Sequence, residues 1–337
     1  MANLAISATC NRKCAYCFTG DHLSGGTAGG HFLNLRDFEA RLDFLDRSGI
    51  DQVRLLGGEP TLHPQFPELV KRARARNKKI IVFTNGLMPE EALVCLESLS
   101  PEASHVLVNV NEPDDAGKGV LERQRAVLRR LGERAMPGFN IYRMDSNPDF
   151  LLSLVAQTHC KPAIRLGLAH PCLSGANRHL HPKQYRAIGE QIVRLARLAA
   201  GNGTRLEFDC GFVRCMFSDA DLAVLQATGA DVGWRCNPIL DVDIQGRVIH
   251  CYPLSRLGSL PLAPDTDAPG LRTAFETRTR PYRQAGVFPE CSTCPFKAVG
   301  DGTSSSERCP GGCLAAAMRR FHHSPFNLIV PHREAAA

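Results

Sequence analysis

The sequence lacks any apolar run of the roughly 18 residues that a membrane-spanning helix needs. It also lacks the basic start and the longer apolar stretch of a secretory signal peptide, since the chain opens with MANLAISATC. A large excess of positive or negative charge is missing as well. The chain has 40 Lys and Arg and 34 Asp and Glu, so its net charge is only +6. These absences favour a cytoplasmic protein with no membrane partner, and they argue against nucleic acid as a partner.

Cysteine, in contrast, is plentiful, with 14 residues in the chain. Without an export signal these thiols are expected to stay reduced, so clustered cysteines indicate metal binding rather than disulfides. Three lie near the start, in CNRKCAYCF (10–18), and eight lie between residues 210 and 313. The other three, Cys95, Cys160 and Cys172, stand apart, and burial as small apolar side chains is the simplest explanation for them.

Short apolar runs alternate with amphipathic stretches through about the first two hundred residues. Strands are expected at 3–8, 52–56, 79–84, 105–110, 139–143 and 163–168, and helices at 35–49, 113–132 and 182–200. This order indicates parallel strands joined by helical crossovers. It predicts an α/β fold, a partial (β/α)6 barrel in residues 1–203, with an open doubly wound sheet as the alternative. The cysteine-rich residues 204–337 are expected to form a second domain.

Polar and glycine-rich signals follow the predicted strands. The three-cysteine loop comes after the first strand, GGEP (57–60) after the second, and TNG (84–86) at the end of the third. Asn109 ends the fourth strand, Asn147 follows the fifth, and only Arg165 lies inside its strand. Ligands of (β/α) barrels bind at the edge formed by the carboxyl ends of the strands, so we expect most of these residues to meet there.

The first cysteine cluster has too few ligands for a closed zinc site. Cys10, Cys14 and Cys17 have the spacing C-x3-C-x2-C, and no fourth nitrogen or sulfur ligand lies nearby in the sequence. A [4Fe–4S] cube takes one thiolate at each iron, so three thiolates leave one iron free to bind something else. Three structural thiols without a metal are the alternative.

The C-x3-C-x2-C loop, with Tyr16 before its last cysteine, and the GGEP tetrad resemble the radical S-adenosylmethionine (SAM) superfamily. The resemblance implies that Cys10, Cys14 and Cys17 hold a [4Fe–4S] cluster whose free iron chelates SAM. It further implies that an electron from the cluster cleaves SAM to a 5′-deoxyadenosyl radical, which takes a hydrogen atom from the substrate. A reductant such as flavodoxin or ferredoxin is expected as a partner.

The same resemblance suggests which residues contact SAM. Gly57 and Gly58 let the backbone approach a ligand closely, and Glu59 can accept a hydrogen bond from the ligand's ammonium group. Arg165 can pair with the ligand's carboxylate. At the fourth strand the chain has VNVNEP (108–113), where the family often carries Ser-Leu-Asp-Gly. The expected contacts are Tyr16, Gly57, Gly58, Glu59, Asn109, Asn147 and Arg165.

The C-terminal cysteines resemble the auxiliary-cluster extension called SPASM, or its shortened twitch form. CNPILDVDIQGRVIHC (236–251) matches C-x9-G-x4-C around an expected hairpin. The next element is C-x2-C-x14-C-x3-C, longer than the family's C-x2-C-x5-C-x3-C by the insert at 297–308. The family's last cysteine is missing, and a pair in DCGFVRC (209–215) stands upstream. The eight cysteines are Cys210, Cys215, Cys236, Cys251, Cys291, Cys294, Cys309 and Cys313.

Eight thiols can hold two [4Fe–4S] clusters, which we favour, or one cluster with four thiols left over. Structural zinc is the alternative, because C-x2-C pairs are typical of zinc ribbons. By analogy with the family, one cluster would use Cys236, Cys251, Cys313 and Cys215. The other would use Cys291, Cys294, Cys309 and Cys210.

The sequence therefore predicts an enzyme that changes a C–H bond of a peptide or small-molecule substrate, giving oxidation, a cross-link or another modification. Because the chain starts at the cluster loop, a peptide substrate is expected to need direct binding or a separate recognition protein. An epimerase is the alternative, with Cys172 in AHPCLSG (169–175) as the hydrogen donor. The alternative from another class is a zinc-stabilised binding module without catalysis.

Overall fold

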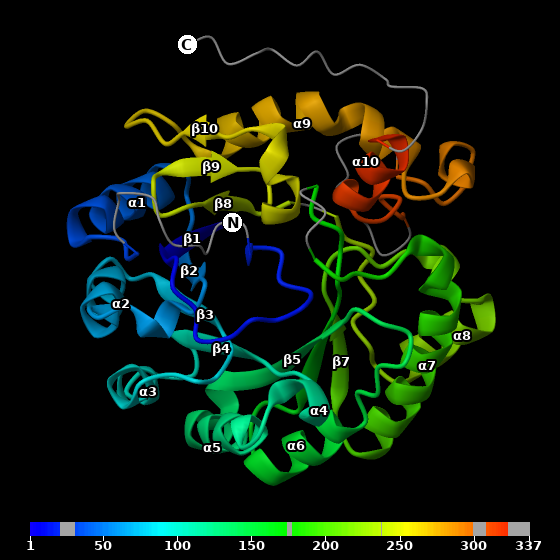
Figure 1. Cartoon of the computed structure of the whole chain (residues 1–337), viewed down its shortest axis with the longest axis horizontal. Coiled ribbons are helices and arrows are strands. Elements are labelled where there is room, and N and C mark those ends of the chain that lie inside the picture. Colours follow the sequence, from blue (N-terminus) through cyan, green and yellow to red (C-terminus); the bar gives the residue numbers. More distant parts are fainter. Residues whose placement is uncertain (21–30, 174–176, 237, 299–307, 323–337) are drawn as a thin grey trace.

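The computed structural model describes residues 1–20, 31–173, 177–236, 238–298 and 308–322. Its centre is one curved sheet with the strand order β10-β9-β8-β1-β2-β3-β4-β5-β6-β7 (Figure 1). β1 to β8 pair in parallel, while β9 and β10 are antiparallel to their neighbours. The strands are β1 (Ala2–Ser7), β2 (Gln52–Gly57), β3 (Lys79–Thr84), β4 (Ser104–Asn109), β5 (Ala135–Ile141), β6 (Ala163–Leu168), β7 (Arg205–Phe208), β8 (Leu240–Val242), β9 (Arg247–Ile249) and β10 (Leu260–Pro261).

Helices line the convex side of the sheet, and α9 lies over the β8–β10 end (Figure 1). Apolar side chains from helices and strands meet in a continuous core, in which Phe38, Val53 and Ile80 have no exposed surface. The helices are α1 (Leu35–Arg47), α2 (Phe66–Ala75), α3 (Glu90–Glu97), α4 (Pro113–Ala116), α5 (Val120–Leu131), α6 (Phe150–Thr158), α7 (Tyr185–Gly201), α8 (Asp219–Ala227), α9 (Ala268–Ala285) and α10 (Leu314–His322).

The predicted α/β class with parallel strands is confirmed, and all six expected strands are present. Two details differ from the prediction. A seventh parallel strand, β7, pairs with β6 and extends the sheet. The helix expected at 113–132 is two helices, because α4 ends at Ala116 and α5 begins at Val120 after a segment with two glycines.

The C-terminal segment is joined to the N-terminal part of the sheet. β8 pairs with β1, and the hairpin of β8 and β9 turns at Gly246 as expected. The buried Arg41 of α1 donates to the carbonyl oxygens of Ala5 (3.1 Å) and Asp243 (2.5 Å), so it links β1 to the hairpin. Burial lowers the pKa of Arg41 to about 10. The domain boundary predicted after residue 203 falls just before β7 and stays a prediction.

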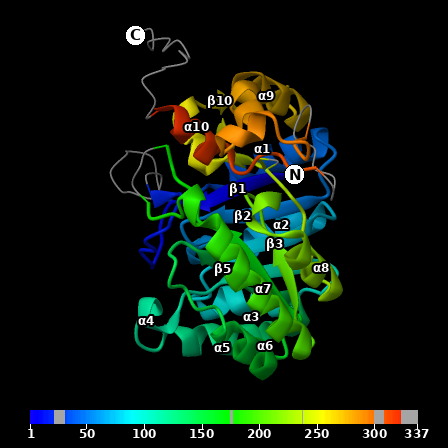
Figure 2. The ribbon, with the colours of Figure 1, turned by 90° about the vertical axis from the view of Figure 1, so that its right-hand side faces the viewer.

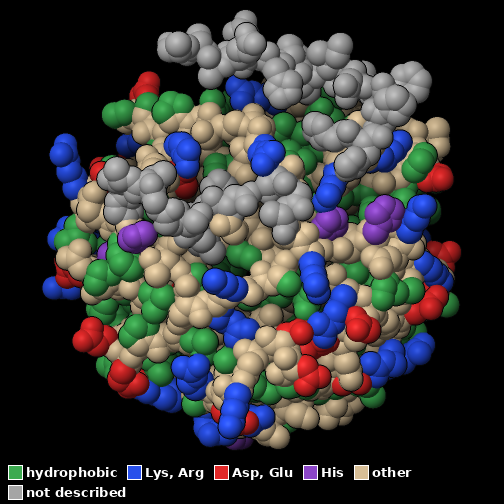
Figure 3. All heavy atoms as spheres, in the orientation of Figure 1, with side chains coloured by type: hydrophobic (Ala, Val, Ile, Leu, Met, Phe, Trp, Pro, Cys, Tyr) green, Lys and Arg blue, Asp and Glu red, His purple; other side chains and the backbone are tan. Residues whose placement is uncertain are grey.

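The loop after β1 and helix α4, which follows β4, project from the same side of the sheet (Figures 1 and 2). This is the edge formed by the carboxyl ends of the parallel strands. On the described part of the face seen in Figure 3, basic and acidic side chains are interspersed. None of the helices in the described ranges is long and apolar enough to cross a membrane.

Candidate functional site

The loop that follows β1 holds Cys10, Cys14 and Cys17, all partly exposed. The Cys17 backbone N–H donates to the Cys14 carbonyl oxygen (3.0 Å), which folds these two residues into one turn. Burial raises the pKa of the Cys10 and Cys17 thiols, and the charge of Cys14 raises both further. The three thiols therefore lie close enough to influence one another, at the carboxyl end of β1 as predicted.

The loop after β2 lies directly against the end of β1. The backbone N–H groups of Gly58 and Glu59 donate to the carbonyl oxygens of Ser7 and Thr9, each at 2.8 Å. Gly57 has φ +144°, and a Cβ there would lie 2.1 Å from the Ser7 oxygen, so only glycine fits this contact. The GGE loop is thus held beside the residue that precedes Cys10.

The side chain of Glu59 is completely buried. Its carboxylate accepts hydrogen bonds from the hydroxyls of Thr61 (2.6 Å) and Thr84 (2.7 Å) and from the Asn85 backbone N–H (2.7 Å). Burial raises its pKa, while these hydrogen bonds oppose that shift. The side chain predicted to contact a ligand thus has no exposed surface, and its hydrogen bonds join the ends of β2 and β3.

Tyr16 and Asn109 are brought together as expected. The Asn109 amide donates to the Tyr16 hydroxyl (2.6 Å), which lies 3.2 Å from the Asn111 side-chain oxygen. Asn140 of β5 donates to the Asn109 side-chain oxygen (2.8 Å), and the Tyr142 ring packs on Tyr16 with centroids 5.2 Å apart. Sequence reasoning missed Asn140, although a polar residue inside the apolar strand FNIYR is a usable signal.

The remaining two predicted contacts lie in separate networks. Arg165 of β6 forms an ion pair with Asp209, the residue that follows β7. Asn147 is exposed, and its backbone N–H donates to Glu112, which also pairs with Arg143. Sequence reasoning missed Asp209 because it did not predict β7, which places this carboxylate at the same edge of the sheet.

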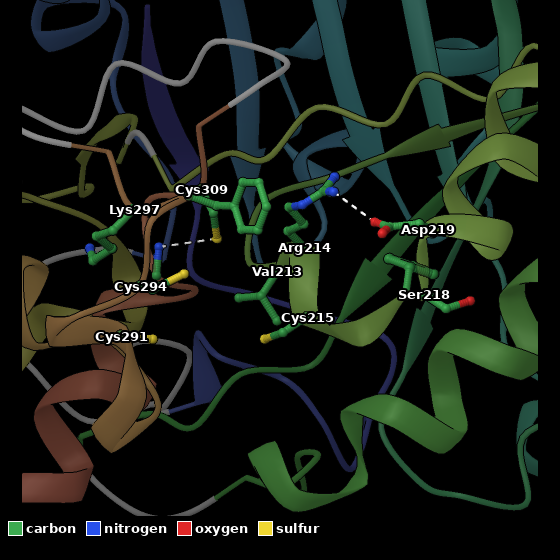
Figure 4. Close-up of a pocket in the computed structure, with 12 residues that line it drawn as sticks. Val213, Arg214, Cys215, Ser218, Asp219, Cys291, Cys294, Lys297 and Cys309 are labelled. Atoms are coloured by element: carbon green, nitrogen blue, oxygen red, sulfur yellow. Dashed lines mark hydrogen bonds and ion pairs between the residues drawn. The ribbon is translucent and has the colours of Figure 1, made fainter.

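Four of the C-terminal cysteines line one cavity, and we call them the outer thiol set: Cys215, Cys291, Cys294 and Cys309. The cavity has a volume of about 420 Å³. Figure 4 shows Cys215 reaching it from the segment before α8, while the other three come from the C-terminal segment. Cys215 is exposed, and the Phe296 side chain at the same cavity is 46% exposed, so the cavity opens to the surface.

The other four form the inner thiol set: Cys210, Cys236, Cys251 and Cys313. None of them is exposed, and Cys236 and Cys313 are buried. A hydrogen bond between these two thiols raises the pKa of Cys236 and lowers that of Cys313. The Leu314 backbone N–H, at the start of α10, also points to the Cys236 sulfur (3.4 Å). Burial raises the pKa of Cys251, and the charges of the other three thiols of the set raise it further.

The structure places Cys210 and Cys215 differently from the predicted grouping, since Cys215 lines the outer cavity and Cys210 lies with the inner set. Cys210 lies two residues after the end of β7, and the Gly211 backbone N–H donates to the Arg235 carbonyl oxygen (2.7 Å). This contact holds Cys210 beside Cys236. Cys215 lies beyond this point, where the chain has turned toward the outer cavity. Gly211 has φ +94°, and a Cβ there would lie 2.0 Å from the His170 ring, so the turn requires glycine.

Two buried hydrogen-bond donors beside the inner set have no acceptor among the described residues. Among the described residues, the buried Tyr185 hydroxyl and the buried Nη2 of Arg283 have no hydrogen-bond partner. Unpaired buried donors are rare in proteins, so an acceptor that completes them is expected. No three His, Cys, Asp or Glu side chains in the described ranges converge on a single metal ion. A cube with irons at separate corners instead needs thiolates spread around it, and its anionic character suits these donors.

The inner set lies close to the loop after β1. The rings of Phe18, which follows Cys17, and Tyr252, which follows Cys251, have centroids 6.0 Å apart. Cys172, predicted as a hydrogen donor, is buried between the two sites: its thiol donates to the Phe18 carbonyl oxygen at 3.5 Å. Cys172 also lies near the inner set, because its charge acts to raise the pKa of Cys313. The hydrogen bond from Cys236 is the larger effect and lowers the pKa of Cys313.

Curated proteins match the first part of the chain. The GTP 3′,8-cyclase of Vibrio vulnificus is 25% identical over 131 residues, which cover 35% of this chain and 39% of that protein. The chain therefore spans about two fifths of the length of this relative. In addition, residues 4–145 match the family model described as the radical SAM superfamily.

Solved structures match over more of the chain. Streptococcus suis SuiB bound to S-adenosylmethionine has a TM-score of 0.61 at 15% identity, covering 94% of this chain and 74% of SuiB. The same protein bound to the precursor peptide SuiA gives a TM-score of 0.57 at 14% identity, with coverage of 79% and 63%. Native anSMEcpe with bound AdoMet gives 0.53 at 16% identity, with 80% of each chain covered.

At these identities the structural likeness establishes the fold. The sequence match identifies the part of the chain that carries the three-cysteine loop and the GGE loop. Residues 4–145, which carry both loops, thus match the radical SAM superfamily, and the chain as a whole shares the fold of SuiB.

Proposed function

We propose that this chain cleaves SAM reductively at the loop of Cys10, Cys14 and Cys17 and removes a hydrogen atom from its substrate. The observation that carries the proposal is the contact between two loops. The GGE loop is held against the end of β1 by the hydrogen bonds of Gly58 and Glu59, immediately before Cys10. A three-thiol site and a close-lying backbone loop thus share the edge of the sheet where barrel enzymes bind ligands.

The residues around the first loop suit a [4Fe–4S] cluster, which supplies, when bound, the electron and the open iron that split SAM. The Asn85 side chain donates toward the Cys10 sulfur (3.8 Å), and the Thr19 hydroxyl lies 3.2 Å from the Cys17 sulfur. Both groups can donate hydrogen bonds to thiolates. Glu59 acts as a positioning residue, because its carboxylate fixes Asn85 and the GGE loop relative to one another.

Arg165 remains our proposed partner for the SAM carboxylate. Its side chain is 25% exposed and that of its partner Asp209 is 36% exposed, so a ligand can reach the pair. The Asp209 carboxylate orients the guanidinium, which keeps donors for a second carboxylate. Tyr16 of the three-cysteine loop and Asn109 of β4, which share a hydrogen bond, are proposed to contact the ligand, as is Asn147 from the segment after β5.

We further propose that the second domain, residues 204–337, holds two iron–sulfur centres, one on each thiol set. Two observations support this. Each set has four thiols, the number that one [4Fe–4S] cube takes. The inner set is lined by unpartnered donors, and the outer set surrounds an open cavity. The alternatives, one centre or structural zinc, differ from this proposal in iron content.

The substrate is proposed to be a peptide or a small molecule, and the reaction an oxidation, a cross-link or another C–H modification. The fold shared with SuiB, which has been solved with a precursor peptide, supports a peptide. The sequence match to a GTP 3′,8-cyclase supports a small molecule. A flavodoxin or ferredoxin as reductant, a separate peptide-recognition protein and a cytoplasmic location remain part of the proposal.

A second reaction, epimerisation, is favoured by the position of Cys172. Its thiol is buried next to Phe18, directly after the three-cysteine loop, where it could return a hydrogen atom to a substrate radical. Exchange of a substrate hydrogen for solvent deuterium without net oxidation would separate this reaction from the leading proposal.

The test of the leading proposal is a variant with Cys10, Cys14 and Cys17 all replaced by alanine. Under reducing, oxygen-free conditions it should form no 5′-deoxyadenosine from SAM, because it lacks the thiolates that hold the cluster. Cys95→Ala, on α3, is the matched control and should keep the activity of the unaltered protein. Undiminished SAM cleavage in the triple variant would contradict the proposal.

A further inference from the structure

Tyr185 is the first residue of α7, and it is 2% exposed. A Cβ at Gly189, one turn later, would lie 2.2 Å from the Met216 carbonyl oxygen, so this face of α7 packs tightly on the segment of Cys215. Residues four apart share a helix face, which directs Tyr185 toward the same segment. Its ring also meets Phe288 edge-on, with centroids 6.1 Å apart. The Tyr185 hydroxyl is therefore enclosed between the segments that carry the C-terminal cysteines.

The electrostatics agree with this placement. Burial raises the pKa of Tyr185, and the largest charge effect on it comes from Cys313 of the inner set. The further thiols that act on it are Cys210, Cys215 and Cys236. A phenol hydroxyl donates one hydrogen bond, and within the described ranges this one has no acceptor.

Arg283 stands on the last turn of α9, and it is 6% exposed. Its Nη1 donates to the Cys236 carbonyl oxygen (2.7 Å), whereas its Nη2 is buried without a partner. It forms no ion pair with any described carboxylate, so its charge is not compensated by an acid. A buried cation of this kind needs an anion beside it. The inner thiols are the candidates, since Arg283 contacts the Cys236 carbonyl oxygen and its charge acts to lower the pKa of the Cys236 thiol.

We propose that Tyr185 and Arg283 donate hydrogen bonds to sulfur atoms of a centre held by the inner thiol set, and that both thereby raise its reduction potential. This inference rests on the auxiliary centres proposed above. Reduction adds one electron and no proton to the centre, so its negative charge grows. A donor and a cation therefore stabilise the reduced form more than the oxidised form.

The outer set offers a natural contrast. The two cations that line its cavity already have partners: Lys297 Nζ donates to the carbonyl oxygens of Arg283 and Pro310, and Arg214 forms an ion pair with Asp219. The Lys297 ammonium group thus already donates to backbone oxygens, whereas Tyr185 and Arg283 each have a buried donor without a partner among the described residues. We expect changes at Tyr185 and Arg283 to alter one centre and to leave the other two unchanged.

The test is an anaerobic redox titration of the iron-loaded full chain, followed by electron paramagnetic resonance. Tyr185→Phe removes only the hydroxyl, and it should lower the midpoint potential of one centre. A tenfold change in the equilibrium constant of a one-electron reduction shifts the midpoint potential by about 59 mV, and we expect a shift of this size for one lost hydrogen-bond donor. Arg283→Met should lower the same midpoint further, and Arg283→Lys by less. Tyr282→Phe is the matched control, because burial alone raises the pKa of Tyr282 and no thiol acts on it.

The outcomes separate the inference from the proposal on which it rests. A lower midpoint for one centre in Tyr185→Phe, with iron content and the Tyr282→Phe potentials unchanged, supports the inference. Unchanged midpoints at unchanged iron content would overturn it and leave the auxiliary centres standing. A C-terminal domain without iron in the unaltered protein would overturn both. Because Tyr185→Phe keeps the ring and its packing, the test holds even if an Arg283 variant fails to fold.

Discussion

The two thiol sets of the C-terminal region differ in access and in the distances along the chain that they span. The inner set draws its thiols from the end of β7, the segments around the β8–β9 hairpin and the start of α10. Three thiols of the outer set come from residues 291–309, and only Cys215 comes from elsewhere. The inner set has buried donors around it and no exposed member, whereas the outer set lines an open cavity.

This difference indicates two roles for similar ligands. A centre on the inner set would cross-link four separate segments beside the three-cysteine loop, so it would stabilise the fold and sit close to the chemistry. A centre on the outer set would close a mostly local loop at the surface. Cross-links between distant segments restrict the unfolded chain more than local ones, which favours the larger stabilising effect for the inner set.

The largest expected effect follows from removing one set at a time. Cys236→Ala with Cys313→Ala should lose about four irons per chain, and so should Cys291→Ala with Cys294→Ala. The inner double variant should lose clearly more stability, measured as the denaturant midpoint of the iron-loaded proteins. Equal losses of stability, or a larger loss in the outer variant, would break the comparison.

A smaller effect is expected in the order in which thiols react. In the metal-free protein at neutral pH, an alkylating reagent should modify the exposed Cys215 first and the buried Cys236 and Cys313 last. Mass spectrometry of the peptides over time measures this order. Iron loading should protect all three thiols. Early modification of Cys236 would mean that the inner set is not enclosed.

The smallest expected effect is a loss of stability at alkaline pH. Burial raises the pKa of Cys210 from 9.0 to about 11 in the folded, metal-free protein. Between these values the unfolded chain loses thiol protons that the folded chain retains, so the free energy of unfolding should fall as pH rises from about 9 to about 11. Cys210→Ala should reduce this fall more than Cys215→Ala, because Cys215 is exposed. A flat profile across this range would contradict the predicted burial.

The sequence was sufficient to predict features that depend on residues close together in the chain. The three-cysteine loop and GGEP each follow a strand with a clear apolar pattern, so their positions at one edge could be predicted. Cys210 and Cys215 are five positions apart, and spacing gives no reason to separate them. The hydrogen bond from Gly211 to Arg235, a contact between distant segments, decides their grouping.

Residues that belong to no sequence motif could not be assigned a role from the sequence either. Tyr185 and Arg283 lie on amphipathic helices, where a tyrosine is expected in the core and an arginine on the surface. Their missing partners can be seen only in three dimensions. Glu59 was predicted as a ligand contact from its motif. Its hydrogen bonds to Thr84 and Asn85 depend on how the loops after β2 and β3 fold against one another, which the motif does not specify.

The most direct test of three separate sulfur sites is the iron and sulfide content of the variant with Cys10, Cys14 and Cys17 replaced by alanine. After anaerobic reconstitution, the unaltered chain should bind about twelve irons and about twelve sulfides, and the triple variant should retain about eight of each. If the triple variant retained only about four irons, the C-terminal region would hold one iron–sulfur centre and not two. Zinc in place of iron in both proteins would contradict the account as a whole.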